Sequence, residues 1–309
     1  MNRLVGTSRV TPESLALMLN PRLPTLSRTA LLASTLLATL LTPACGDEGK
    51  VSQKYAAELV EKLAPVLKED VGQVRRGLPG GAAKLGAMLE ADPGANLLAL
   101  QKAIGGARAS EKDLQVAKST FFSFADPNGT VLRSEADPDM LANRSVVAAF
   151  PELKNAIGPQ AGLVEAFGEM QEMRGVRNGP DHQWVVAHPV KGADGQLKGM
   201  FVTGWSFRAY AYRLQEAGKR ELGEITKRDQ LKSSPLLYVF VFKAGKAYGE
   251  KLTPDVNAEA IEKLDLAAKT ASGAWSGTLE ISGRTFGVAA QRAPDLAPDA
   301  GIATLISTL

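Results

Sequence analysis

Residues 121–134 read FFSFADPNGTVLRS, which is two short apolar runs joined by Asp-Pro-Asn-Gly and followed by charged residues. The run at 120–124 is rich in β-prone residues, Pro127 suits the second position of a turn, and Gly129 stands where a positive φ is favoured. A second run begins at Val131. The stretch therefore predicts a β-hairpin and sets the start of a sheet.

A second pair of strands follows about fifty residues later. Residues 182–190 (HQWVVAHPV) and 197–207 (LKGMFVTGWSF) are apolar runs on either side of the turn KGADGQ. Strands this apolar are not expected to be fully exposed. The intervening residues 137–157 and 162–175 are predicted to be mainly helical.

The same order of elements then recurs downstream. Residues 208–233 predict a long charged helix, 235–252 two strands about KAGK, 257–271 a helix, and 277–293 with 301–309 the closing strands. Two hairpin-and-helix units in one chain predict an α+β fold. Each unit is expected to be an antiparallel sheet with covering helices.

An amphipathic helix precedes the first unit. Apolar residues recur at helical spacing with charged residues between them, and they predict a packing face: Tyr55, Leu59, Leu63, Val66 and Leu67. Residues 46–53 are expected to form a polar tether. Pro79, with glycines on both sides of it, predicts a break or a bend near 77–81. Shorter helices at 82–90, 96–104 and 110–117 would follow.

Residues 1–45 have the features of a secretory leader. Arg22 and Arg28 precede ALLASTLLATLL (30–41), an uncharged run that is short for a membrane span. Cys45, the one cysteine of the chain, stands at the end of this segment. The segment resembles the lipobox of a bacterial lipoprotein signal peptide, with a start at Met18 as an alternative to Met1. We predict lipidation at Cys45.

Two observations bear on this assignment. Ala44 suits the lipobox, whereas Thr42 and Pro43 depart from its usual pattern, so a secreted protein or an unprocessed anchor is the alternative. Residues 1–45 hold four of the 36 basic and one of the 33 acidic residues, which leaves 32 of each. A neutral mature chain without a basic stripe argues against a nucleic-acid partner.

The two strand pairs resemble the Cache domain, the extracytoplasmic PAS-like sensor of chemoreceptors and sensor kinases. Two patterns carry the resemblance. The first is the Asp-x-x-Gly turn at 126–129. The second is the apolar-Pro-Val, Asp-Gly, Gly-apolar pattern: His188, Pro189, Val190, Asp194, Gly195 and Gly199. With the long helix and the second unit, the resemblance implies a double Cache arrangement over about residues 50–309.

The resemblance also has departures. Cache domains usually sit between two transmembrane helices and drive a cytoplasmic output, whereas this chain stops at Leu309, so we expect a sensor module without its own transmitter. The residue set of the amino-acid-binding subgroup does not align here, and that ligand class is not implied.

The predicted organisation has five parts. They are a lipoprotein signal peptide at 1–45, a tether and helical segment at 46–118, a first Cache-like unit at 119–206, a connecting helix at 207–234 and a smaller second unit at 235–309.

No catalytic constellation can be assembled. The mature chain has no thiol besides Cys45, no Gly-x-Ser-x-Gly turn and no P-loop. His182 and His188 would share one face of a strand, and with Asp181 they could hold a metal, although two unrelated polar side chains are the simpler interpretation. We predict a non-enzyme without a metal or cofactor.

Three residues are predicted to bind a ligand. Trp184 and His188 alternate onto one face of a strand, and Arg144 lies in the segment expected to cover the sheet. A buried Arg would suit a carboxylate or a phosphate because its planar fork pairs in a bidentate way. A surface Arg and a core Trp are the alternatives.

These inferences predict a non-enzymatic extracytoplasmic sensor lipoprotein that binds a small molecule and signals through a partner protein. It would be lipid-anchored in the cell envelope, with Gly46 after the cysteine favouring the outer membrane. The alternative is a structural or assembly lipoprotein of the envelope that has a Cache fold without a ligand.

Overall fold

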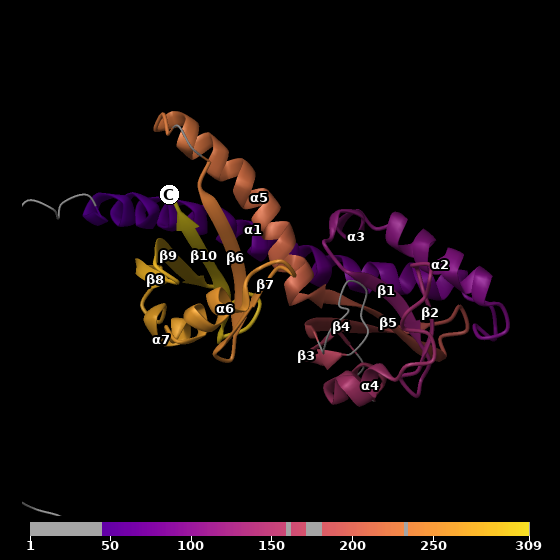
Figure 1. The fold of residues 1–309 in the computed structure, drawn as a ribbon. Helices are drawn as coiled ribbons and strands as arrows, with labels where there is room; N and C mark the ends of the chain where they lie inside the picture. Colours follow the sequence, from indigo (N-terminus) through magenta and orange to yellow (C-terminus); the bar gives the residue numbers. More distant parts are fainter. Residues whose placement is uncertain (1–44, 159–161, 171–180, 232–233, 309) are drawn as a thin grey trace, which may run out of the picture. The chain divides into compact units, whose positions relative to one another are not determined.

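The computed structural model describes residues 45–158, 162–170, 181–231 and 234–308 of the 309-residue chain (Figure 1). The predicted signal peptide lies outside these residues, apart from the backbone of Cys45, and so does the lipobox. None of the helices in the described part of the chain combines the length and apolar character that a bilayer crossing requires.

The first unit is a five-stranded antiparallel sheet in the order β2-β1-β5-β4-β3. Its strands are β1 (Phe121–Ala125), β2 (Val131–Ser134), β3 (Val164–Met170), β4 (Asp181–Lys191) and β5 (Leu197–Ser206). Helices α2 (Leu97–Ala109) and α3 (Lys112–Val116) precede the sheet, and α4 (Val146–Ala149) and the 3-10 helix η1 (Pro151–Ile157) lie between β2 and β3.

The hairpin predicted at 121–134 is confirmed. Phe124 pairs with Arg133, and Gly129 has a φ of 81° in the turn. The Asp126 carboxylate accepts the main-chain N–H groups of Asn128 and Thr130, at 2.9 and 2.8 Å. The Asp and Gly of this turn thus serve turn geometry.

The second sheet repeats the first. Its order is β7-β6-β10-β9-β8, the same topology with each strand replaced by its counterpart. The elements are α5 (Phe207–Arg228), β6 (Leu236–Lys243), β7 (Lys246–Gly249), α6 (Asp255–Glu262), α7 (Leu266–Lys269), β8 (Trp275–Ile281), β9 (Arg284–Arg292) and β10 (Ala300–Ser307). The predicted α+β fold with two related units is confirmed.

Helix α1 (Cys45–Met88) packs against both sheets. The predicted stripe is buried, except that Val66 is 39% exposed. Further along the helix, Val71, Val74 and Leu78 join the same hydrophobic cluster, which includes residues of β4 and β5 from the first sheet and β9 and β10 from the second. One helix therefore shares a continuous core with both sheets.

Of the break or bend predicted near Pro79, the break does not occur, because α1 runs through Pro65 and Pro79 to Met88. The glycines near Pro79 make room for α3. A Cβ on Gly77 would lie 2.9 Å from the Leu114 side chain, and one on Gly81 would lie 2.5 Å from it. Close packing of α3 thus accounts for the glycines that local propensity assigned to a break.

Three further expectations need correction. Residues 46–53 are helical and form the start of α1, so they are no tether. The segment 162–175 was expected to be helical, but its described part forms β3, because Val164–Met170 pairs along its length with β4. The helix expected at 257–271 is two short helices, α6 and α7.

We predict that Gly86→Ala destabilises the protein. A Cβ at this buried position of α1 would lie 2.0 Å from the main-chain O of Lys191, and a backbone carbonyl cannot turn away as a side chain can. The free energy of unfolding in urea should fall by about 1–3 kcal/mol.

Gly223→Ala in α5 is the matched control, because a Cβ there would meet nothing within 4 Å. It should raise the free energy of unfolding by about 0.5–1 kcal/mol through helix propensity alone. Equal stability of the two variants would contradict the close contact between α1 and β4.

Candidate functional site

The first sheet has two chemically different faces. On β4, Trp184 and Val186 point to one face and belong to the core built around α1, which we call the α1 face. Val185 and Ala187 point to the other face and pack with residues of α4 and η1, which we call the α4 face. Since side chains alternate along a strand, Asp181 and Gln183 share the α4 face.

A polar cluster occupies one end of the α4 face. Asp181 and Gln183 have no exposed surface, and Ser206 at the end of β5 is 1% exposed. Gln183 and Ser206 are register partners. The Ser206 hydroxyl donates a hydrogen bond to Asp181 Oδ2. The same Oγ accepts the N–H of Ala209 at 3.1 Å and so caps helix α5.

Two acceptor atoms of this cluster lack a donor. Within the described residues, Asp181 Oδ1 and Gln183 Oε1 are buried without a hydrogen-bond partner. Burial raises the pKa of Asp181, while the hydrogen bond from Ser206, the charge of Arg208 and the main-chain N–H groups of Arg208 and His182 oppose that rise. Buried acceptors without donors are costly, so this position suits a ligand that brings donors of its own.

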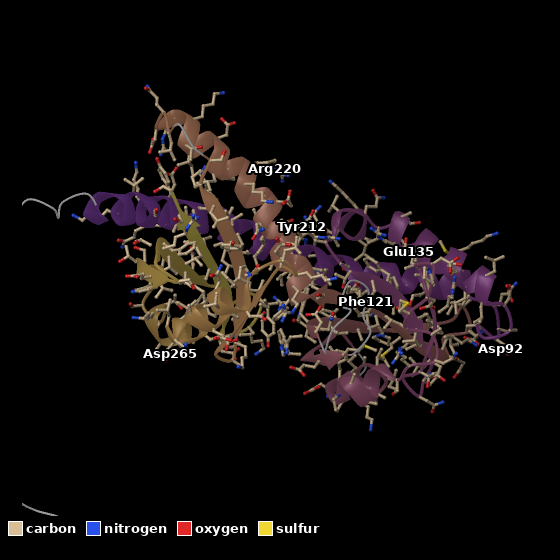
Figure 2. All side chains as sticks on the ribbon, viewed as in Figure 1. Asp92, Phe121, Glu135, Tyr212, Arg220 and Asp265 are labelled. Carbon is tan, nitrogen blue, oxygen red and sulfur yellow. The ribbon has the colours of Figure 1, made fainter. Side chains whose placement is uncertain are left out.

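The remainder of the α4 face is closely packed. Ser123 and Ser134 are hydrogen-bonded to each other at 2.7 Å, and the Asp139 carboxylate accepts the main-chain N–H of Ser134 at 2.7 Å. A depression beside Asp139 is lined partly by Phe121 of β1, which is labelled in Figure 2. Its free volume of about 20 Å³ has room for one water molecule.

Trp184 lies on the α1 face, where its ring is packed and its Nε1 has a hydrogen-bond partner. Its Nε1 donates to Glu165 Oε2 at 2.8 Å, and Arg75 of α1 holds both oxygens of that carboxylate at 2.6 and 2.8 Å. The Trp205 ring packs edge-on against Trp184, with ring centroids 4.5 Å apart. These contacts attach β3, β4 and β5 to α1.

The three residues predicted to bind a ligand do not converge. His188 shares the α1 face with Trp184, as expected, and its Nδ1 lies 3.0 Å from the main-chain O of Pro189. Burial lowers the pKa of His188. Arg144 is exposed beside β2, at the opposite edge of the sheet from β3, and donates to the Met140 carbonyl at 3.2 Å. A ligand role for these residues stays a prediction.

The metal site considered for His182, His188 and Asp181 is not assembled. The two histidines share one face of β4, and Asp181 lies on the other face. The His182 ring stacks on Tyr248, with centroids 5.2 Å apart, and burial and the charge of Lys243 lower its pKa. No group of three metal-ligating side chains occurs in the described part of the chain.

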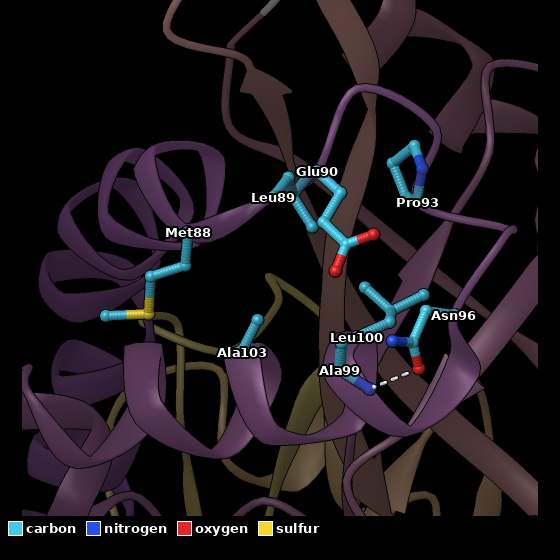
Figure 3. A pocket seen from close by; sticks show the side chains of 8 residues that line it. All are labelled: Met88, Leu89, Glu90, Pro93, Asn96, Ala99, Leu100 and Ala103. Carbon is cyan, nitrogen blue, oxygen red and sulfur yellow. Dashed lines mark hydrogen bonds between the residues drawn. The ribbon is translucent and has the colours of Figure 1, made fainter.

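A second depression lies where α1 ends and α2 begins (Figure 3). Its lining includes Met88, Glu90 and Asn96, and the Asn96 side chain accepts the N–H of Ala99 at 3.1 Å as the cap of α2. Its free volume is about 10 Å³. Because that space would hold at most one water, this depression is no ligand site.

The polar cluster on the α4 face was missed from the sequence, where Asp181 was considered only as a metal ligand. The signal was present, since Asp181 and Gln183 interrupt an apolar strand at a spacing of two and must share a face. Their burial and their contact with Ser206 depend on the pairing of β4 with β5, which no local pattern shows.

Comparisons with known proteins are informative only for the fold. Models of known protein families and the curated proteins gave no match. Among solved structures, the extracellular domain of the histidine kinase vpHK1S-Z8 aligns with 84% of this chain and 92% of its own, at 9% identity and a TM-score of 0.50.

Two other solved structures align less closely. The ligand-binding domain of the Pseudomonas aeruginosa PAO1 amino acid chemoreceptor PctC, in complex with GABA, aligns over 83% of this chain and 99% of its own, at 15% identity and a TM-score of 0.47. An extracellular ligand-binding receptor from Desulfohalobium retbaense aligns over 81% of this chain but only 39% of its own length, at 16% identity and a TM-score of 0.44. A function must therefore be argued from the site.

We predict that Asp181→Asn stabilises the protein at neutral pH. Burial of the ionised Asp181 carboxylate destabilises the folded state, as its raised pKa shows. This loss of folding free energy is complete at pH values above the pKa of the folded state. The destabilisation becomes smaller as the pH falls, and it is absent below 3.8, the pKa of the carboxyl in the unfolded chain.

Urea unfolding of the parent protein and of Asp181→Asn at neutral pH and near pH 3 measures this difference. The gain in the free energy of unfolding should be present at neutral pH and vanish at the acidic pH. A gain of equal size at both pH values would show that burial of the charge is not its cause.

Proposed function

We propose that this protein is a non-enzymatic extracytoplasmic sensor that binds a small molecule at the α4 face of the first sheet and signals through a partner protein. One observation carries the proposal: Ser206 both donates to the buried Asp181 carboxylate and caps helix α5. A ligand that engages Asp181 would therefore act directly on the start of the helix that leads to the second unit.

The chemistry of the cluster indicates the kind of ligand. Asp181 Oδ1 and Gln183 Oε1 are both acceptors and lack donors among the described residues. A small molecule with a protonated amine or another strong donor would satisfy them, and a charged donor forms the stronger hydrogen bond with a carboxylate. This replaces the carboxylate ligand expected from Arg144, which is distant from the cluster in the strand order.

The start of α5 is coupled to α1 by a second set of contacts. The Tyr210 ring stacks on Trp205, with centroids 4.1 Å apart, and the Tyr210 hydroxyl donates to Asp70 Oδ2 at 2.8 Å. A shift of the Ser206 cap would disturb this contact between α5 and α1. The proposed signal therefore passes along two helices that both reach the second sheet.

The packing of the α4 face favours a second candidate function. The depression beside Asp139 has room for only one water, and the central part of this face is filled by apolar side chains such as Phe150 and Leu153. A structural or assembly protein of the envelope that binds no small molecule would be built in this way.

A thermal-shift screen of small amines, amino acids and carboxylates separates the two functions. A ligand that binds only the folded state must raise the melting temperature. For the sensor we expect a hit among the amines, with binding weakened at least about tenfold by Gln183→Leu because a buried acceptor is lost. Glu152→Ala, an exposed change in η1, is the control and should leave binding unaltered.

Absence of any shift across the screen would reject the sensor and leave the structural role. A hit that is insensitive to Gln183→Leu would place the ligand elsewhere. A carboxylate hit that is lost in Arg144→Ala would restore the site first predicted from the sequence.

The anchor forms a further part of the proposal. Lipidation of Cys45 after removal of residues 1–44 would tether the start of α1 to a membrane of the cell envelope. Gly46, the residue after the cysteine, favours the outer membrane by analogy with the sorting of other lipoproteins. We predict that a fatty-acid analogue labels the protein in cells and that Cys45→Ala abolishes the label. Label that persists in Cys45→Ala would exclude this anchor, whereas the ligand test is independent of it.

A further inference from the structure

A groove of about 550 Å³ lies between α5 and the start of β6. It is far larger than the depressions on the first unit and falls in the range that small-molecule sites occupy. Residues of α5, of the start of β6 and of the segment after β7 line it: Gln215, Lys219, Leu222, Gly223, Thr226, Ser234, Pro235, Leu236, Leu237, Tyr238, Glu250 and Leu252. Leu252 is 80% exposed, and a Cβ on Gly223 would meet nothing within 4 Å.

The groove contains a carboxylate, Glu250, that forms no ion pair within the described residues. Glu250 is half-buried, and its Oε1 accepts the Gln215 side-chain amide at 3.0 Å. Lys219 also lines the groove; its ammonium is held by Glu216 at 2.6 Å and interacts electrostatically with Glu250, so that one ammonium stands against two carboxylates. The charge left for a ligand is therefore negative, in a setting whose other walls are largely apolar.

The free edge of β6 adds main-chain acceptors to this groove. β7 pairs with Phe240–Lys243 only, and nearer the start of β6 the N–H of Val239 donates to Gln215 Oε1 at 3.1 Å. The main-chain N–H and C=O groups of every second residue point to the same edge of a strand. Those of Leu237 therefore point to the same edge as the N–H of Val239. Among the described residues no strand covers them.

We propose that this groove is a second binding site that takes an apolar amine. The ammonium would pair with Glu250 and donate to the Leu237 carbonyl, and the apolar body would lie along Leu222 and Leu252. Charge complementarity decides the class, because two carboxylates, Glu216 and Glu250, face the single ammonium of Lys219, and the excess negative charge favours a ligand that brings a cation. The inference stands apart from the proposed function, since it uses neither Asp181 nor Gln183.

Isothermal titration of the full chain with 2-phenylethylamine, tyramine and hexylamine tests the site, with uncharged 2-phenylethanol as the chemical control. We expect amine binding that is at least about tenfold tighter than binding of the alcohol, since a charge-assisted hydrogen bond is lost in the alcohol. Glu250→Gln keeps the hydrogen bond to Gln215 and should remove that preference for the amine.

Two substitutions on α5 locate the site. Gly223→Phe should abolish binding, because its ring would enter the groove where no atom lies within 4 Å of the Cβ. Glu224→Phe, at an exposed position of α5 outside the groove lining, should leave affinity within about twofold. Unfolding in urea checks that both variants stay folded. Absence of binding by all three amines, equal binding of amine and alcohol, or full binding by Gly223→Phe would overturn the proposal.

Repeating the titration in Asp181→Asn separates the two sites. Amine binding that survives in Asp181→Asn and is lost in Gly223→Phe supports the groove, even if the screen for the α4 face fails. Binding that is lost in Asp181→Asn and kept in Gly223→Phe would assign the amine to the α4 face and reject the groove.

Discussion

The packing of α1 against both sheets is the constraint on which the rest of the structure depends. Leu59, Leu67 and Val74 are fully buried on this helix, and their cluster contains residues of both sheets. The fit is close enough that a Cβ on Gly287 of β9 would lie 2.0 Å from the backbone of Ser52. Neither sheet can shift along α1 without disturbing the core of the other, because a densely packed interior deforms little.

This arrangement gives the two faces of the first sheet different tasks. The α1 face is used for attachment, since the contacts of Trp184 with Glu165 and Arg75 tie three strands to the helix. The α4 face does not contact α1 in this way. It carries the buried side chains of Asp181 and Gln183, each of which has one oxygen without a hydrogen-bond donor among the described residues. Trp184 is thus an example of a large aromatic residue in an interior strand whose contacts on the α1 face join the sheet to the helix.

Much of the architecture could be predicted from local patterns. The turn at Asp126–Gly129, the strand pair at 182–206 and the recurrence of element order each depend on residues that are neighbours in the chain. The same local reasoning failed at Pro79, where the helix continues because packing with α3 outweighs the low helix propensity of proline and glycine. It failed again at β3, an edge strand whose conformation is imposed by pairing with β4.

The sequence by itself determined the α+β class, the two related units and the long helix, because hydrophobic periodicity and turn residues act over a few positions. Only the tertiary structure decided which polar side chains meet. Asp181 and Ser206 are 25 residues apart in the chain and come together through the register of β4 with β5. Glu250 and Gln215 meet because β7 stops short of the start of β6, and both candidate sites follow from such pairings.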